Sequence, residues 1–188
     1  SRVLSDLAAA KPDSPMVIVN AGAISPLLSA LSNGSTKVKD EACNALCNLS
    51  INSPSTQLAI ATGLAALLGM GTAEAQEHLA QLMLTLCKDK SNLAAISEVR
   101  PIKGLVKQIR EGGNDKAEEQ AVAVLSHLTA ASETDVDDLV ASNGVKPLVS
   151  MLGTHSALAR ANASAVISHI AARSPQNQLM LIAESAIA

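Results

Sequence analysis

The sequence predicts an all-α protein, a right-handed solenoid of short helices, and three observations support that prediction. An apolar pattern recurs around Leu4, Leu46, Met83, Leu125 and Ile167, which gives repeats of 42, 37, 42 and 42 residues. A second marker, a turn followed by Leu-Leu or Leu-Val, comes about 20 residues after each copy of the first. No stretch alternates polar and apolar residues as a half-buried strand does. Two markers in step at this period are typical of stacked helical repeats.

Each repeat is predicted to begin with a short helix and then a second helix. Residues 56–61 and 135–142 are examples of the first helix. A glycine is expected to mark the sharp turn after it, because glycine commonly ends a helix; these are Gly22, Gly63 and Gly144. Pro26 and Pro147 suit the first turn of the second helix. That helix should end near residues 33–34, 69, 111–113 and 153, where glycines recur.

The third helix of each repeat is predicted to be the longest. In residues 38–50, for example, apolar side chains recur with helical spacing. Proline cannot continue a helix, so the prolines that follow third helices should end them; these are Pro12, Pro54 and Pro175.

We predict a single domain over residues 1–188. It divides into a partial repeat at 1–13, four repeats at 14–53, 54–90, 91–132 and 133–174, and a partial repeat at 175–188. Both ends cut through repeats, and repeats bury their cores only against neighbours. We therefore expect the chain to be part of a longer protein, or further segments to cap it.

Composition excludes several classes of function. The net charge of −3 argues against nucleic acid, whose binding needs clustered Lys and Arg. The longest apolar stretch, residues 58–70, is too short for membrane insertion, which takes roughly 20 residues. There is no Phe, Tyr or Trp, so no site can rest on aromatic stacking.

Three cysteines, an odd number, indicate a reducing compartment, so we expect a cytoplasmic protein, with the nucleus also compatible. The cysteines are interpreted as small buried thiols. Charge runs at residues 37–41, 88–90, 115–119 and 135–138 are interpreted as solvated faces or as first helical turns matched to the helix dipole. No phosphate loop, dinucleotide motif or paired metal ligands occur. We therefore predict no enzyme activity, no cofactor and no metal.

The repeat resembles the armadillo repeat over essentially the whole chain. The residues that carry the resemblance are Gly22-Ala23-Ile24-Ser25-Pro26-Leu27-Leu28 and Ala45-Leu46-Cys47-Asn48-Leu49-Ser50. Among armadillo families it is most similar to the repeats that follow the U-box in plant ubiquitin ligases. Lys39-Asp40-Glu41-Ala42, Asn48-Leu49-Ser50-Ile51 and Ile109-Arg110-Glu111-Gly112 carry that finer similarity. HEAT repeats are the structural alternative, although they usually lack a separate short first helix.

The resemblance implies a binding site on the concave face, which third helices line in armadillo proteins. There the family usually places an asparagine in each repeat, whose amide pairs with the backbone of an extended peptide. The equivalent positions here are Asp6, Asn48, Thr85, His127 and His169. One helical turn earlier lie Asn44, Gln81, Ala123 and Ala165, and another turn back lie Glu41, His78, Gln120 and Asn162. The polar members of these sets, Asp6 excepted, are the predicted peptide-binding residues.

Simpler interpretations of the same residues stay open. His78, His127 and His169 could be polar residues on a solvated face, and Asn48 could cap a helix or join two repeats. Neighbouring third helices ~10 Å apart would hold these imidazoles too far apart to share a zinc ion, whose ligands lie ~2 Å away.

Three functions are compatible with this sequence. The first is a scaffold that binds a peptide segment of another protein along the concave groove. The second is the substrate-recognition region of a U-box ubiquitin ligase, and the third is a structural subunit of a larger assembly. Basic nuclear-localisation peptides are disfavoured, because importin-like members carry a Trp where this chain has Asn44, Gln81, Ala123 and Ala165.

Overall fold

The computed structural model describes residues 14–50, 53–111, 114–154 and 156–185. These residues form twelve α-helices and one 3-10 helix, with no strand in the described ranges, so the predicted all-α solenoid is confirmed. The helices are α2 (Ser14–Asn20), α3 (Ile24–Asn33), α4 (Thr36–Ser50), α5 (Pro54–Leu67), α6 (Ala73–Cys87), η1 (Lys90–Asn92), α7 (Leu93–Glu98), α8 (Ile102–Glu111), α9 (Asp115–Ala131), α10 (Glu133–Ala141), α11 (Val145–Met151), α12 (Ala157–Arg173) and α13 (Pro175–Ser185).

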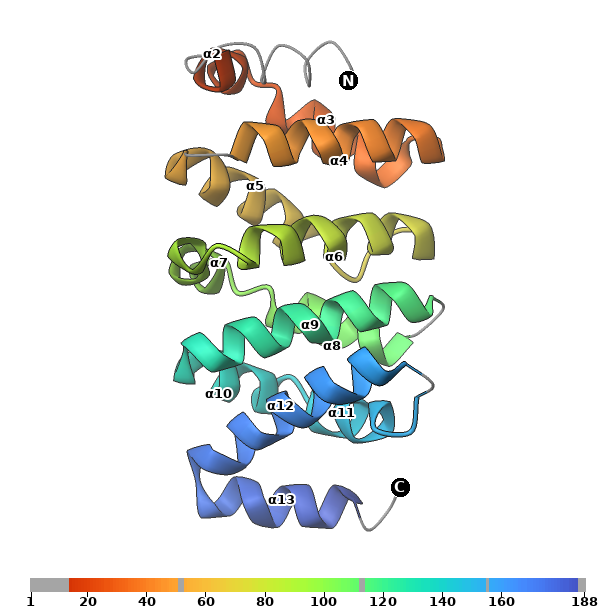
Figure 1. The fold of residues 1–188 in the computed structure, drawn as a ribbon, viewed down its shortest axis with the longest axis vertical. Coiled ribbons are helices and arrows are strands. Elements are labelled where there is room, and N and C mark those ends of the chain that lie inside the picture. The colour runs from red at the N-terminus through yellow and green to blue at the C-terminus, as the bar shows by residue number, and fades with distance from the viewer. Residues whose placement is uncertain (1–13, 51–52, 112–113, 155, 186–188) are drawn as a thin grey trace.

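The third helices stack side by side along the long axis of the molecule. In Figure 1, α4, α6, α9 and α12 are stacked one after another along the vertical axis, with α3, α5, α8 and α11 behind them. Each third helix contacts the next one, α4 with α6, α6 with α9, and α9 with α12. The longest helices are therefore held in one layer, as the repeat pattern predicts. Each α-helix lies within one predicted repeat, although the repeat boundaries themselves stay a prediction.

One continuous core runs through the stack. Its largest fully buried side chains are leucines, isoleucines and one methionine, including Leu46, Met83 and Leu125 at the repeat anchors. Alanines on the third helices, among them Ala42, Ala121 and Ala163, are also fully buried. Small side chains at these positions let neighbouring helices approach closely. The interior can therefore be densely packed although the chain has no aromatic residues.

The predicted turn at Gly63 is wrong, and so is the short first helix at residues 56–61. A single helix, α5, runs from Pro54 through Gly63 to Leu67. Only five residues separate Gly63 from Gly69, too few for a second helix to be stable by itself. Instead, Gly63 allows α5 to pack against α3, because a Cβ there would lie 2.1 Å from Leu28 Cδ1.

The predicted turn at Gly22 is confirmed, whereas the turn before α11 uses a different residue. Gly22 has a φ of 81°, in the left-handed region. Before α11 that conformation belongs to Asn143, with a φ of 57°, and Gly144 has an ordinary φ of −78°. Arg100 occupies the same place before α8, with a φ of 50°. Pro54 and Pro175 begin new helices just after third helices, as expected; Pro12 lies outside the described residues.

Candidate functional site

The candidate site is the solvent side of α4, α6, α9 and α12, which we call the third-helix face. Of the residues predicted to line it, four are exposed: Asn44, Gln81, Thr85 and His127. Five are partly buried: Glu41, Asn48, Gln120, Asn162 and His169. Because residues three and four apart share one side of a helix, the exposed members form a polar row that crosses α4, α6 and α9. Asp6 lies outside the described residues.

His78 is the exception, because it is buried and joins two repeats. Its Nε2 lies 2.8 Å from Asp40 Oδ1 on α4, and its Nδ1 lies 2.8 Å from the carbonyl oxygen of Glu74. Both partners are acceptors, so the two hydrogen bonds form together only when both ring nitrogens carry protons. His78 thus connects α6 to α4 through a buried side-chain contact.

His169 and Asn48 also have partners within the chain. His169 Nδ1 lies 2.9 Å from Thr129 Oγ1, which links α12 to α9. Asn48 is half-buried and takes part in an interaction as well. The His169 contact joins two third helices, a role that the sequence suggested for Asn48 and not for this histidine. Gln120 differs, since its Oε1 is buried and accepts no hydrogen bond from the described residues.

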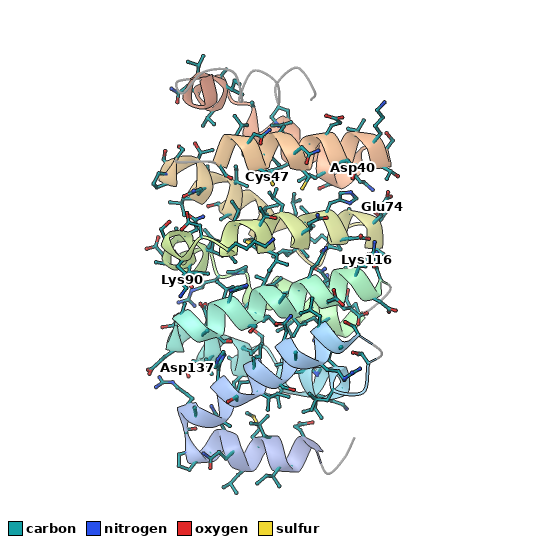
Figure 2. All side chains as sticks on the ribbon, in the orientation of Figure 1. Asp40, Cys47, Glu74, Lys90, Lys116 and Asp137 are labelled. Atoms are coloured by element: carbon teal, nitrogen blue, oxygen red, sulfur yellow. The ribbon has the colours of Figure 1, made fainter. Side chains whose placement is uncertain are left out.

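The starts of the third helices are joined by charged groups. Lys39 Nζ lies 2.9 Å from Glu74 Oε2, and Glu77 accepts from the Asn114 side-chain amide at 2.8 Å. Figure 2 shows Asp40, Glu74 and Lys116 along the same edge of the stack. Hydrogen bonds from Thr36 and then from Lys39 lower the pKa of Glu74. Negative charge at this edge is therefore largely paired within the chain.

An acidic residue recurs in this edge at Asp40, Glu77 and Glu119. Each one bonds to the next third helix: Asp40 to His78, Glu77 to Asn114 and Glu119 to Ser156. Asn114 and Ser156 also cap the helices they precede, accepting from backbone N–H groups of the first turn. The same side chains thus start a helix and fix it to the preceding repeat.

Two of the charge runs, which were interpreted as solvated faces or as dipole-matched first turns, contain buried residues. Lys39 in the run 37–41 is 4% exposed, and Asp135 in the run 135–138 is 1% exposed. Burial raises the pKa of Asp135, although a hydrogen bond from Ser97 Oγ at 2.5 Å partly opposes that rise. Neither residue lies on a solvated face, but Asp135 does lie in the first turn of α10, which is the other interpretation given for that run.

A groove of about 590 Å³ is lined by residues of α8, α10, α11 and α13, together with Glu118 of α9. Its apolar lining includes Ile109, Val140, Val145, Met151 and Met180. No sequence pattern indicates this groove, because its walls come from residues far apart in the chain.

The described residues hold no set of three or more His, Cys, Asp or Glu side chains placed to bind a metal ion. Among the helices of the described ranges, none combines the length and the apolar character needed to cross a bilayer.

Comparison with known proteins bears on the fold. The family model described as the Armadillo/beta-catenin-like repeat matches residues 11–51. Two solved structures are similar to 98% and 99% of this chain, and to 80% of their own chains. One is a computationally designed armadillo repeat protein for modular peptide recognition, with a TM-score of 0.73 at 22% identity. The other is a designed armadillo repeat protein in complex with the peptide (KR)4, with a TM-score of 0.72 at 20% identity.

The chain therefore has the fold of an armadillo repeat protein. The segment that the family model matches contains helices α2, α3 and α4. No curated protein sequence matches this chain significantly. None of these matches bears on the plant U-box subgroup, which stays a prediction.

Proposed function

We propose that this chain is a protein-interaction scaffold whose third-helix face binds an extended segment of a partner protein. The observation that carries the proposal is the exposed polar row at Asn44, Gln81, Thr85 and His127, which spans three stacked helices at two adjacent repeat positions one helical turn apart. Amide, hydroxyl and imidazole groups can both donate and accept, so they suit a peptide backbone. Four helices at ~10 Å each give a track of ~40 Å, long enough for about a dozen extended residues.

The character of the row suggests the kind of peptide. Towards α9 and α12 the amides give way to Ala123 and Ala165, and small residues leave room for larger peptide side chains. The acidic groups at the edge of the face already have partners: Glu74 pairs with Lys39, and Glu77 with Lys116. A basic peptide would have to compete with these lysines, so we propose a polar or apolar segment rather than a basic nuclear-localisation sequence.

The experiment selects peptides of about 12 residues from a displayed random library and measures their affinity by fluorescence anisotropy. The test variant combines Asn44→Ala, Gln81→Ala and His127→Ala, all at exposed positions. The matched control combines Ser29→Ala, Lys103→Ala and Lys146→Ala, which are exposed on the second helices α3, α8 and α11. We expect at least about a tenfold loss of affinity in the test variant, or about 1.4 kcal/mol, and none in the control. Equal affinities would remove the third-helix face as the binding surface.

A second candidate is a structural subunit, and the surface of α13 favours it. Leu179 and Ile182 are 70% and 65% exposed, and contiguous apolar surface often marks a permanent contact. This candidate predicts that the purified chain self-associates, which sedimentation velocity measures. A monomer at all concentrations would count against it.

The finer proposal, that the bound segment belongs to the substrate of a ubiquitin ligase, rests on the resemblance at residues 39–42 and 48–51. Finding a U-box in the same transcript would support it, and a full transcript without one would refute it.

A further inference from the structure

Three cavities have Glu118, near the start of α9, in their walls. They are the groove of about 590 Å³, a cavity of about 180 Å³ and a smaller cavity of about 90 Å³. The groove is mainly apolar, and Val145, Met151 and Met180 are among the residues that line it. Sites for organic ligands have volumes of roughly 300–1,000 Å³ and combine apolar walls with a few polar groups. The groove therefore has the size and the lining of a small-molecule site.

The carboxyl group of Glu118 has no partner within the described part of the chain. No hydrogen bond and no ion pair joins its side chain to another of the described residues. Partial burial raises the pKa of Glu118, and the negative charge of Asp115 raises it further. The ionised carboxylate thus loses water without gaining a compensating contact. A positive charge placed beside it would favour the ionised form.

The basic side chains of the groove do not supply that charge. Arg110 lines the groove, but its guanidinium group lies 3.9 Å from a carboxylate oxygen of Glu111. Lys146 also lines the groove, and it is exposed, so its ammonium group keeps its water. Glu184 is the other acid in the lining. Two basic and two acidic side chains therefore line the groove, yet the carboxylate of Glu118 stays unpaired.

Two buried oxygen atoms in the same cavities also lack a partner. Gln108 is 5% exposed and lines the smallest cavity. Its Nε2 donates to the carbonyl oxygens of Ala117 and Gln76, whereas its Oε1 accepts no hydrogen bond from any described residue. Thr154, whose Oγ1 is likewise buried and unpaired, lines both larger cavities. Since an amide oxygen only accepts and a hydroxyl oxygen also accepts, these positions suit a ligand that donates hydrogen bonds.

We propose that the groove binds an organic amine, with its ammonium group on the Glu118 carboxylate and its aliphatic body against Met151 and Met180. An ammonium group carries three donors and no acceptor. It therefore pairs with Glu118 and still has donors for the unpaired oxygens of Gln108 or Thr154. This inference does not rest on the proposed peptide binding.

Other ligand classes fit the same groups less well. A carboxylate ligand would bring a like charge beside Glu118 and Asp115, and it has no donor for the unpaired oxygens. A neutral alcohol could donate one hydrogen bond but would leave the charge of Glu118 unpaired. Charge complementarity at Glu118 thus selects the amine.

The test titrates the full chain with n-octylammonium chloride and measures affinity by isothermal titration calorimetry. Octanol and octanoate present the same aliphatic body with a different head group, and ethylammonium presents the same head group without the body. We expect octylammonium to bind at least about tenfold more tightly than each of the three. Equal affinities for octylammonium and octanol, or no binding of octylammonium, would overturn the proposal.

A pair of variants assigns the charge that is recognised. Glu118→Gln keeps the size of the side chain and should weaken octylammonium binding at least about tenfold, while octanol binding stays unchanged. The matched control is Glu98→Gln, which removes the same charge from an exposed position at the end of α7 and should leave both affinities as they are. Undiminished octylammonium binding in Glu118→Gln would refute the role of Glu118.

Methyl NMR of the methionines locates the ligand in the parent chain without any substitution. We expect octylammonium to shift the methyl signals of Met151 and Met180, which line the groove, and to leave those of Met70 and Met83 in place. Shifts at Met70 or Met83 without shifts at Met151 and Met180 would place the ligand elsewhere and overturn the proposal.

Discussion

Replacing Gly104 with alanine should destabilise the protein, although helix propensity alone predicts the opposite. Gly104 is the third residue of α8. A Cβ at this position would lie 2.7 Å from Leu68 Cβ and 3.0 Å from the Leu68 carbonyl oxygen, at the end of α5. Because the backbone of Leu68 cannot turn aside as a flexible side chain can, α5 and α8 would have to move apart.

The change in the free energy of unfolding caused by Gly104→Ala follows from two opposing effects. Alanine gains about 1 kcal/mol over glycine inside a helix, and overpacking a buried contact costs about 1–3 kcal/mol. Contact with backbone atoms puts the cost at the upper end, so the net loss is about 1–2 kcal/mol. At about 2–4 °C per kcal/mol for a chain of this size, Tm falls by about 2–8 °C.

The assay is thermal unfolding followed by circular dichroism, with Gly153→Ala as the matched control. A Cβ at Gly153 meets nothing closer than the Ser150 carbonyl oxygen at 3.5 Å, an ordinary contact. The control should stay within about 0.5 kcal/mol of the parent. A Gly104→Ala variant with an unchanged or higher Tm would refute the argument from close packing.

Two further predictions concern buried polar groups. His78→Ala should cost about 1–2 kcal/mol, since it removes the hydrogen-bonded contact between α4 and α6. His127→Ala, at an exposed position, should cost under about 0.5 kcal/mol; equal urea midpoints for the two variants would contradict a stabilising contact at His78. Asp135 has a raised pKa, so its contribution to stability is largest below the ordinary carboxyl pKa of about 3.9 and is lost as pH rises through the raised value. Asp135→Asn should therefore gain stability relative to the parent as the pH rises from about 3.5 to about 7. If the unfolding free energies of the variant and the parent differ by the same amount at every pH, the raised pKa of Asp135 is excluded as a source of pH dependence.

The sequence was sufficient for the third helices because two signals coincide there. Apolar residues at helical spacing run through α4 and α9, and prolines mark the breaks after α4 and α12. Burial of the anchors Leu46, Met83 and Leu125 then follows from the repeat. The element types depend on short-range spacing, which a single sequence displays directly.

The first helix and the turn of the second predicted repeat were predicted wrongly because a glycine has two uses that look alike in a sequence. Gly63 serves close packing against Leu28 rather than a turn. Conversely, Asn143 makes the left-handed turn that the adjacent Gly144 was expected to make. Both outcomes depend on tertiary contacts and on the length left for the next helix.

For the candidate site, spacing predicted which residues share a face but not which of them are buried. His78 occupies the same position in its repeat as Gln120 does, yet His78 is hydrogen-bonded to Asp40, 38 residues away. A usable signal was present, since the acids at 40, 77 and 119 recur with the same 37- and 42-residue steps as the anchors. Their partners could be named only once the helices were stacked in register.

Binding at the third-helix face can be tested by locating a bound peptide on the surface of the chain. A photoreactive benzoylphenylalanine replaces Gln81 or His127 on the third-helix face, or Lys103 or Lys146 on the second helices, and the library-selected peptide is then irradiated with each variant. We expect crosslinked peptide from positions 81 and 127 and none from positions 103 and 146. Crosslinks from 103 or 146 alone would place the peptide on the second helices and refute binding at the third-helix face.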